Sequence, residues 1–430
     1  MARSKPTSRN PWYWISSLYF AEGLPYVVVM SVAVTMYKRL EISNAEIAFY
    51  TSWLYLPWVI KPLWSPIVDI LKTKRFWILA MQLLIGGALA GIAFTLPMDK
   101  FFQYTLAFFW LMAFSSATHD IAADGFYMLG LTKHDQAYFI GIRNTFYRFA
   151  VLAGKGLLVI LAGQMEKIAG NDNQWAWSIT FFVIAGLFIA FAIWHWLMLP
   201  YPTSDVKKES QSVKQVLSDF AETFITFFKK DGILLGLTFI LIFRLGEAQL
   251  EKLATPFMLD SVEAGGLGLT TTTVGTIYGI AGMLALTVGG ILGGILISRN
   301  GLKKWMLPMV IAMNLPNVVY VFLSFVQPQA LWIIMSSVVV EQFGYGFGFT
   351  AFMLYLIYLS DGKYKTAHYA LCTGFMALGM MLPGMISGWI QEQLGYQNFF
   401  IWVVISTIPG FIIIHYLKYD PKFGMREEKK

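Results

Sequence analysis

Long apolar runs separated by short polar segments make up most of the chain. Residues 76–97 (FWILAMQLLIGGALAGIAFTLP) contain no Asp, Glu, Lys or Arg, and residues 175–199, 305–327 and 396–414 share this pattern. A helix of about 20 predominantly apolar residues crosses the ~30 Å hydrocarbon core of a bilayer. The pattern therefore predicts an all-α protein whose helices cross a membrane several times.

Applied to the whole chain, the same pattern predicts twelve membrane-spanning helices. They are expected at residues 12–37, 45–66, 76–97, 102–128, 137–164, 175–199, 231–259, 270–297, 305–327, 329–359, 365–393 and 396–417. The first run carries one charged residue, Glu22, and lacks a cleavage site of small residues. Because eleven further runs follow it, we expect it to be a retained helix rather than a cleaved signal peptide.

The composition agrees with a membrane protein. Hydrophobic residues account for 57% of the chain and charged residues for 13%, whereas soluble domains carry about a quarter charged residues. The single cysteine, Cys372, lies inside a predicted span, which excludes a disulfide framework and a cysteine-based metal site. No motif in the sequence calls for a metal or another cofactor.

Basic residues are concentrated in alternate loops. With the N-terminus in the cytoplasm, the cytoplasmic segments carry 22 of the 32 Lys and Arg residues, and the outer loops carry only Lys38, Arg39, Lys100 and Lys167. Cytoplasmic loops are the richer in Lys and Arg, so both termini are expected in the cytoplasm. The net charge of +7 then reflects topology, and the scattered loops offer no coherent basic face to a nucleic acid.

The chain also contains an internal repeat. A polar stretch, expected to be a cytoplasmic linker at 201–230, separates an N-terminal six-helix half (1–200) from a C-terminal one (231–430). At an offset of 229 residues, SPIVDILKTKR (65–75) aligns with GILISRNGLKK (294–304). Paired six-helix repeats are typical of transporters that rock around a site near the bilayer midplane.

Both aligned segments resemble the G-x-x-x-D-R-x-G-x-R-R signature of the major facilitator superfamily. The second copy keeps Gly294, Arg299, Gly301, Lys303 and Lys304, with Ser298 in place of the acid, and the first copy keeps Asp69, Lys74 and Arg75. The resemblance implies a fold in which spans 1, 4, 7 and 10 line a central cavity. It also implies a latch between helices, to which we assign Asp69, Lys74, Arg75, Arg299 and Lys303.

Acidic residues well inside the predicted spans, away from their ends, are restricted to those four helices. A charge near the bilayer centre costs roughly 2.5–3.5 kcal/mol on insertion scales, so its presence needs a reason. The six carboxylates are Glu22, Asp120, Asp124, Glu247, Glu251 and Glu341. A carboxylate in a desolvated cavity can take up a proton at a pH where an exposed one stays ionised. The candidate proton carriers are Glu22, Asp120, Asp124 and Glu341.

Spans 4 and 5 are expected to form an antiparallel hairpin. For two residues at equal depth in such a hairpin, one on each helix, the sum of their sequence numbers is nearly constant. Asp120 with Arg148 gives 268 and Asp124 with Arg143 gives 267. The aspartates share a helix face, whereas the arginines lie about 140° apart. We therefore expect one arginine to pair with an aspartate and the other to face the cavity or a loop. A purely structural role for the aspartates stays open.

Other polar and glycine-rich positions have simpler interpretations. His119 lies beside Asp120, but no second cluster accompanies them, which makes a metal site improbable. On span 7, Arg244, Glu247 and Glu251 form an i, i+3, i+7 stripe. The glycines at 289–294 and in GYGFGF (344–349) are expected to allow close helix packing rather than phosphate binding.

Several stretches resemble one family within the superfamily, the AmpG-type permeases of the peptide/acetyl-CoA transporter group. SSATHDIAADGFY (115–127) resembles the S-Q-D-I-x-x-D-A-Y signature of its helix 4, and EQFGYGFGFTAFMLYLIYL (341–359) resembles its glycine-rich helix 10. YKTAHYALCTGFMALG (364–379), LPWVIKPLWSPIVD (56–69) and EGLPY (22–26) match further helices. The resemblance covers nearly the whole chain.

This resemblance implies a permease of the bacterial inner membrane. Such permeases import muropeptides, GlcNAc–1,6-anhydro-MurNAc with or without peptide, from periplasm to cytoplasm, driven by the proton gradient. The matched positions Lys61, Asp120, Asp124 and Glu341 would then carry function. Polar contacts decide which substrate such a site accepts. The family's glutamines are replaced by His119 and His368, so a siderophore, another oligosaccharide or an acetyl-CoA-like cargo stays an alternative.

A sugar–peptide cargo would need hydrogen bonds, aromatic platforms and a cation for its carboxylate. The expected substrate contacts are Lys61, His119, Arg148, Glu247, Glu251, Arg244 and Tyr26. Protonation of an aspartate would release its paired arginine, so Arg143 is assigned to gating.

Other function classes fit less well. A membrane hydrolase or acyltransferase would need a nucleophile–base motif, yet none occurs and the five histidines are dispersed. A sensor would usually need a signalling domain, and the longest polar segment has only about 30 residues. We expect a transporter rather than an enzyme, and a monomer, because the fold needs no partner.

Overall fold

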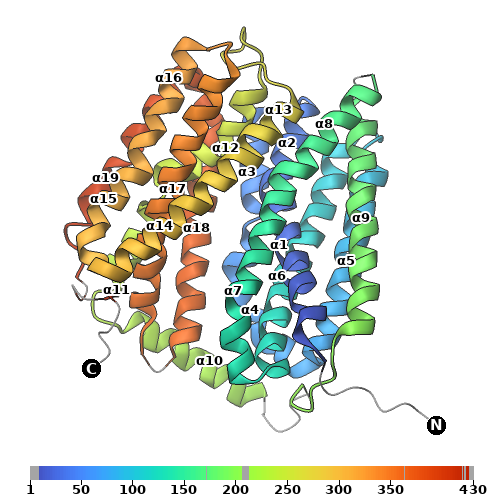
Figure 1. Ribbon diagram of the computed structural model, residues 1–430, viewed down its shortest axis with the longest axis vertical. Coiled ribbons are helices and arrows are strands. Elements are labelled where there is room, and N and C mark those ends of the chain that lie inside the picture. The colour runs from blue at the N-terminus through green and yellow to red at the C-terminus, as the bar shows by residue number, and fades with distance from the viewer. Residues whose placement is uncertain are drawn as a thin grey trace. The chain divides into compact units, whose positions relative to one another are not determined.

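The structure, a computed structural model, describes residues 9–170, 172–205, 213–362, 364–418, 420 and 423–425. Every regular element in these ranges is a helix (Figure 1). The predicted all-α fold class is therefore confirmed.

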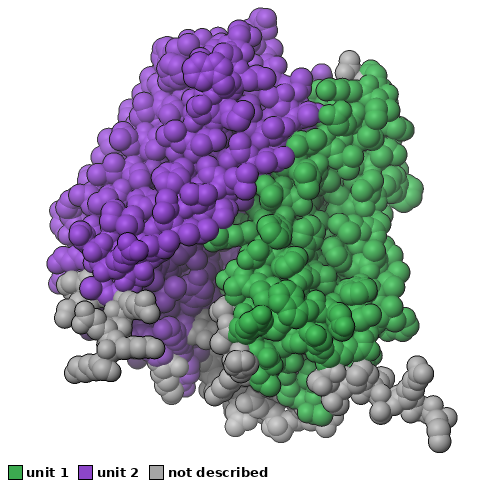
Figure 2. Space-filling view, in the orientation of Figure 1, with its two compact units in different colours: residues 1–40, 60–217 green, residues 41–59, 218–430 purple. Residues whose placement is uncertain are grey.

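The helices form two compact units (Figure 2). Unit 1 comprises Met1–Leu40 and Ile60–Leu217, and unit 2 comprises Glu41–Val59 and Ser218–Lys430. Residues 41–59, the first part of the second predicted span, thus belong to unit 2, although the chain before and after them belongs to unit 1.

Unit 1 is built from the helices of the first six predicted spans. Its elements are η1 (Pro11–Tyr13), α1 (Ile15–Val27), η2 (Val28–Val32), α2 (Ala33–Arg39), α4 (Leu56–Leu71, from residue 60), α5 (Lys74–Thr95), α6 (Phe101–Gly130), α7 (Lys133–Leu152), η3 (Ala153–Leu158), α8 (Val159–Ile168) and α9 (Asn173–Met198). Side chains of Thr73, Thr132 and Asp172 accept backbone N–H groups at the starts of α5, α7 and α9. Such caps satisfy donors that a helix start leaves open.

Unit 2 contains the remaining helices. Its elements are α3 (Asn44–Trp53), α10 (Val213–Phe228, from residue 218), α11 (Ile233–Ile242), α12 (Leu245–Leu259), α13 (Thr271–Val274), η4 (Gly275–Gly282), α14 (Met283–Asn300), α15 (Leu302–Asn314), η5 (Leu315–Asn317), α16 (Val318–Val326), α17 (Leu331–Ser360), α18 (Lys365–Ser406) and α19 (Ile408–Ile413). Helix α3 is tied to α18, because Asn44 Nδ2 donates to Gln391 Oε1 at 2.7 Å and to Tyr396 OH at 2.9 Å.

Nine helices of the described residues are long and apolar enough to cross a membrane. The predicted spans 11 and 12 appear there as one helix, because α18 runs through a kink at Gly395 (φ 70°, ψ 166°). Helix α6, which carries two aspartates and a histidine, and the α3–α4 pair are not among the nine. The nine helices do not fully confirm the count of twelve.

Several predicted spans are locally irregular. Span 7 is broken between α11 and α12, where Arg244 has φ −102° and ψ 18°. The π-helical segments η2, η3 and η4 interrupt spans 1, 5 and 8. π-Bulges are frequent at functional sites, and broken helices border the binding sites of many transporters.

Close glycine packing joins α14 to α17. A Cβ placed on Gly293 would lie 2.9 Å from the Phe347 carbonyl oxygen, and one on Gly289 would clash with the backbone of Phe343. Gly346 approaches the backbone of Leu286 equally closely. The predicted packing role is confirmed for these glycines. It is wrong for Gly294, which has open space around it because it faces away from α17.

The helix before span 7, α10, docks on the start of α18. Phe227 is fully buried and stacks on Phe375, and Thr226 Oγ1 lies 3.2 Å from His368 Nε2. Lys230 Nζ donates to the carbonyl oxygens of Leu359 (2.8 Å) and Asp361 (2.6 Å) at the end of α17. Burial of its ammonium group lowers the pKa of Lys230.

Candidate functional site

Unit 1 holds a cluster of charged and tyrosine side chains, which we call the N-terminal cluster. Its members lie on α1 (Tyr19 and Glu22), α4 (Lys61), α6 (Asp120 and Asp124) and α7 (Arg143). The salt bridges are Arg143 Nη2–Asp124 Oδ1 at 2.8 Å and Lys61 Nζ–Asp120 Oδ2 at 3.7 Å. Four helices that are separate in sequence therefore contribute to one charged site.

The guanidinium of Arg143 is held by aromatic rings as well as by Asp124. Its Cζ lies 4.4 Å from the ring centroid of Tyr19 and 5.0 Å from that of Tyr127. The Tyr19 hydroxyl donates to Asp124 Oδ1 at 3.3 Å. Arginine stacks on aromatic faces and binds carboxylates with its planar fork, so both contacts orient it.

Glu22 is the most buried carboxylate of this cluster. It is 7% exposed, whereas the Asp124 side chain is 47% exposed. Charges that act on it are Asp124, Asp120, Arg143 and Lys61. Its Oε2 is buried and accepts no hydrogen bond among the described residues. Burial without a hydrogen bond costs free energy in either protonation state, and the cost is larger for an ionised carboxylate than for a protonated one.

The expectation that one of the two arginines on span 5 pairs with an aspartate of span 4 is confirmed. Asp124 pairs with Arg143, as the depth argument predicts. Asp120 pairs with Lys61 of α4, while Arg148 is exposed on α7. The sum of two residue numbers indicates that the residues lie at the same depth, but not in which direction their side chains point. Because the two arginines lie about 140° apart around the helix, Arg148 points away from the aspartates.

His119 lies apart from the acidic cluster although it precedes Asp120 in sequence. It is fully buried, and its Nε2 lies 3.0 Å from Gln82 Nε2. Gln82 Oε1 lies 2.9 Å from His195 Nδ1, and His195 Nε2 lies 2.9 Å from Ser17 Oγ. This series of contacts between buried polar side chains connects α6, α5, α9 and α1. The pattern of polar and apolar positions in the sequence did not predict it.

Tyrosines border the N-terminal cluster. Tyr26 is half-buried on α1. Gly23, on the same helix, would bring a Cβ within 3.2 Å of the Tyr147 ring. Tyr147 in turn lies within electrostatic range of Tyr26, Asp120 and Glu22. Hydroxyl groups and apolar rings thus lie beside the charges, an arrangement suited to a polar ligand with flat faces.

Unit 2 holds a second cluster, which we call the C-terminal cluster, around the break between α11 and α12. Arg244 is 6% exposed, and its Nη2 donates to Tyr345 OH of α17 at 2.5 Å. Its Cζ lies 5.1 Å from the Phe349 ring. Glu247 is buried and Glu251 half-buried on α12, and both act electrostatically on Arg244.

Glu341 lies deep in unit 2 and is 1% exposed. Gln342 Nε2 donates to both of its carboxylate oxygens, at 3.1 and 3.0 Å. Tyr320 OH donates to Oε2 at 3.5 Å. Hydrogen bonds of this kind satisfy a buried carboxylate.

Sequence reasoning missed one cation site of the C-terminal cluster. Lys252 is 3% exposed, and its Nζ donates to Thr51 Oγ1 at 3.0 Å and lies 5.2 Å from the Tyr55 ring. Thr51 and Tyr55 belong to the second predicted span. The apolar pattern of that span contained no signal that they meet span 7.

The residues assigned to the latch have different environments. Lys74 is buried against Gly125 of α6. Arg75 donates to the Trp196 carbonyl oxygen at 2.5 Å. Arg299 and Lys303 are exposed around the α14–α15 turn, and the side chain of Asp69 lies outside the described residues.

Sequence comparison finds relatives along most of the chain. A family model described as Major Facilitator Superfamily matches residues 15–361. The putative transporter AmpG 4 of Rickettsia conorii is 27% identical over 419 residues, which cover 93% of this chain and 94% of that relative. The anhydromuropeptide permease of Escherichia coli K12 is 28% identical over 405 residues, covering 92% of this chain and 77% of the relative.

Comparison with solved structures finds the same fold. A D-xylose–proton symporter matches with a TM-score of 0.72 at 10% identity, over 95% of this chain and 98% of the symporter. The nucleoside transporter NupG matches with a TM-score of 0.68 at 16% identity, over 94% and 98% of the two chains. At these identities the likeness shows the fold alone.

Proposed function

This chain belongs to the Major Facilitator Superfamily, and from that premise we propose that it imports muropeptides by proton-coupled alternating access. The cargo would be GlcNAc–anhydro-MurNAc, with or without peptide, moving from periplasm to cytoplasm. The observation that carries the proposal is the similarity to relatives named AmpG or anhydromuropeptide permease over more than nine-tenths of the chain. The chain is a transporter of a small molecule, embedded in the inner membrane by several helices.

Proton coupling would depend on buried carboxylates that can exist in two charge states. In the N-terminal cluster, a proton on Glu22, Asp120 or Asp124 would weaken the attraction that holds Arg143 and Lys61. In the C-terminal cluster, Glu341 would play the same part. Release of Arg143 would then allow α7 to shift against α1 and α6, so that proton uptake favours one conformation.

Cargo recognition would use cations beside aromatic rings. Arg244 contacts both Tyr345 and Phe349, a geometry that offers N–H donors to a carboxylate and ring faces to a sugar. The further proposed contacts are Lys61, His119, Arg148, Glu247, Glu251 and Tyr26. Because His119 is fully buried, its contribution would be to hold α6 in place.

Gating is assigned to Asp69, Lys74, Arg75, Arg143, Arg299 and Lys303. Helix breaks and charged loops at the ends of spans would take up the motion of alternating access. We further propose that both termini lie in the cytoplasm and that the transporter acts as a monomer.

Uptake of radiolabelled GlcNAc–anhydro-MurNAc into membrane vesicles tests the proposal. With an imposed inward proton gradient, label should accumulate above the external concentration, and a protonophore should abolish this excess. Vesicles without the protein provide the control. Folded protein that takes up no label would overturn the cargo assignment. A thermal-shift screen of siderophores, oligosaccharides and acetyl-CoA would then find the alternative cargo.

A further inference from the structure

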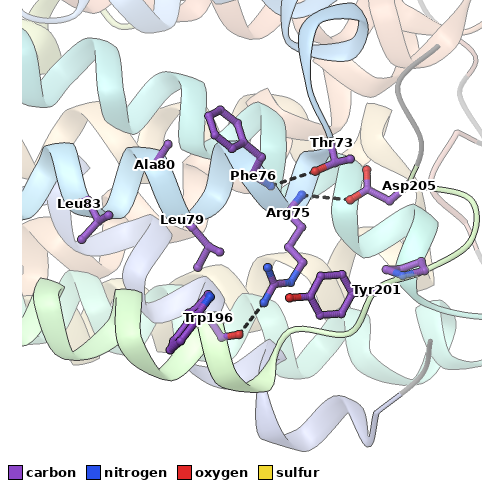
Figure 3. Close-up of a pocket in the computed structure, with 10 residues that line it drawn as sticks. Thr73, Arg75, Phe76, Leu79, Ala80, Leu83, Trp196, Tyr201 and Asp205 are labelled. Carbon is purple, nitrogen blue, oxygen red and sulfur yellow. Dashed lines mark hydrogen bonds between the residues drawn. The ribbon is translucent and has the colours of Figure 1, made fainter. Parts of the chain in front are cut away.

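A groove lies between the start of α5 and the end of α9 (Figure 3), and none of its lining residues belongs to either charged cluster. Its volume is about 540 Å³, within the range of small-molecule sites. Phe76, Leu79, Leu83 and Trp196 form an apolar wall, and Arg75 and Tyr201 lie at one end. The groove therefore has a long apolar part and a short polar part.

The groove lies at the end of two membrane-spanning helices. Lys74 is the first residue of one candidate span, and Met198 is the last residue of another. Beyond the groove, α5 and α9 continue as exposed apolar surface, with Leu84 43% and Ile193 54% exposed. A surface of this kind faces acyl chains, so a ligand of the groove reaches it from the bilayer.

Basic groups surround the polar end. Arg75 stacks on Tyr201, with Cζ 4.0 Å from the ring centroid, and is within electrostatic range of the like charge of Arg9. The exposed Lys72 has its Nζ 5.7 Å from the centroid of the Phe76 ring. Asp205 is the acidic group here, and its carboxylate accepts the backbone N–H groups of Lys74 (2.8 Å) and Arg75 (3.1 Å).

We propose that this groove binds an anionic phospholipid. The phosphate lies by Lys72 and Arg75 at the membrane boundary, and one acyl chain follows the apolar wall between α5 and α9. Among the residues that the structure describes at this end, the cations Arg9, Lys72 and Arg75 outnumber the carboxylate of Asp205, which favours a negative headgroup. Basic pockets between membrane helices recognise anionic lipid headgroups in this way. The inference needs only the membrane location and is independent of the cargo.

Lipid titration of the purified, delipidated protein in a neutral detergent tests this site. Native mass spectrometry compares dioleoyl-phosphatidylglycerol with dioleoyl-phosphatidylcholine, which has the same chains but no net charge. Phosphatidylglycerol should bind several-fold more tightly. Glycerol 3-phosphate and inorganic phosphate, which lack acyl chains, should show no saturable binding.

Two variants test the contact with the lipid headgroup and the contact with the acyl chain separately. Lys72→Gln should weaken phosphatidylglycerol binding about fivefold, the equivalent of about 1 kcal/mol for one basic residue near an anionic lipid. Ala80→Trp should fill the groove and remove binding of this lipid without a change of charge. Lys304→Gln, a loss of charge at an exposed position of α15 in unit 2, is the matched control and should bind as the wild type does.

Three results would overturn the inference. They are equal affinity for the two lipids, wild-type lipid binding in both groove variants, and saturable binding of inorganic phosphate, which would indicate a site for soluble anions. Because the side chain of Lys72 is exposed, Lys72→Gln should fold normally even if Ala80→Trp does not. Leu83→Gln, at a position that is 52% exposed, is the second variant of the apolar wall.

Discussion

At the scale of single residues, the buried carboxylates have two kinds of environment. Asp124 and Asp120 form salt bridges with Arg143 and Lys61. Glu341 is enclosed by neutral hydrogen-bond donors.

Glu22→Gln removes the most buried acid of the N-terminal cluster and keeps its shape. Proton-driven accumulation of labelled cargo should fall to the level without a gradient, because the neutral amide cannot load a proton. Exchange of labelled for unlabelled cargo should persist, since it needs no net proton movement. Both are measured in the same vesicles.

The control for this variant is Glu263→Gln, in an exposed loop. Hydrogen bonds from its own backbone N–H and from Ser261 lower the pKa of Glu263, so its carboxyl is ionised at neutral pH and has no coupling role. Its removal should leave accumulation unchanged. Wild-type accumulation by Glu22→Gln would exclude Glu22 as a proton carrier.

Arg244→Lys keeps the charge but loses the planar fork. A lysine cannot both donate to Tyr345 and stack on Phe349 as the guanidinium does. Cargo affinity in an equilibrium binding assay should fall about tenfold, equivalent to about 1.4 kcal/mol. Tyr345→Phe removes the same hydrogen bond, so the double variant should lose less than the sum of the two. Strictly additive losses would mean that the pair does not act together.

At the scale of elements, glycine spacing decides how closely helices approach. Gly289 and Gly293 lie against the backbone of α17, and Gly346 lies against α14. Small residues at such interfaces allow the van der Waals contact that holds membrane helices together. The same spacing did not identify which glycines of the 289–294 run face α17.

Gly289→Ala and Gly294→Ala should have opposite effects on stability. The first places a methyl group against the carbonyl oxygen of Phe343 and should cost about 1–3 kcal/mol through overpacking. The second adds a methyl group in open space and should stabilise the helix by up to about 1 kcal/mol. Thermal unfolding in one detergent measures both. Equal midpoints would contradict the packing of α14 on α17.

At the scale of the whole molecule, loop charge predicts which side of the membrane each loop faces. Cys372 is the single cysteine and is buried, so Cys372→Ser provides a background for added cysteines. In spheroplasts, a membrane-impermeant maleimide should label Asp99→Cys directly and Lys304→Cys only after permeabilisation. Both positions are exposed. The reverse pattern would mean that both termini face the periplasm.

Much of the architecture follows from the sequence by itself. Runs of about 20 apolar residues form helices in a bilayer, because there the backbone N–H and C=O groups must form hydrogen bonds with each other. The restriction of acids to spans 1, 4, 7 and 10 indicated where polar chemistry lies. Depth and helical phase predicted that one arginine of span 5 pairs with an aspartate of span 4, and the structure shows that this arginine is Arg143.

Only the tertiary structure decided how side chains from distant segments meet. The pairing of Lys61 with Asp120, the contact of Lys252 with Thr51 and the contact of Gln82 with His195 all join helices that do not follow one another. The sequence pattern determines which residues occupy a helix and at what depth. The direction in which each helix face points depends on its packing against neighbours, and local periodicity contains no information about those neighbours.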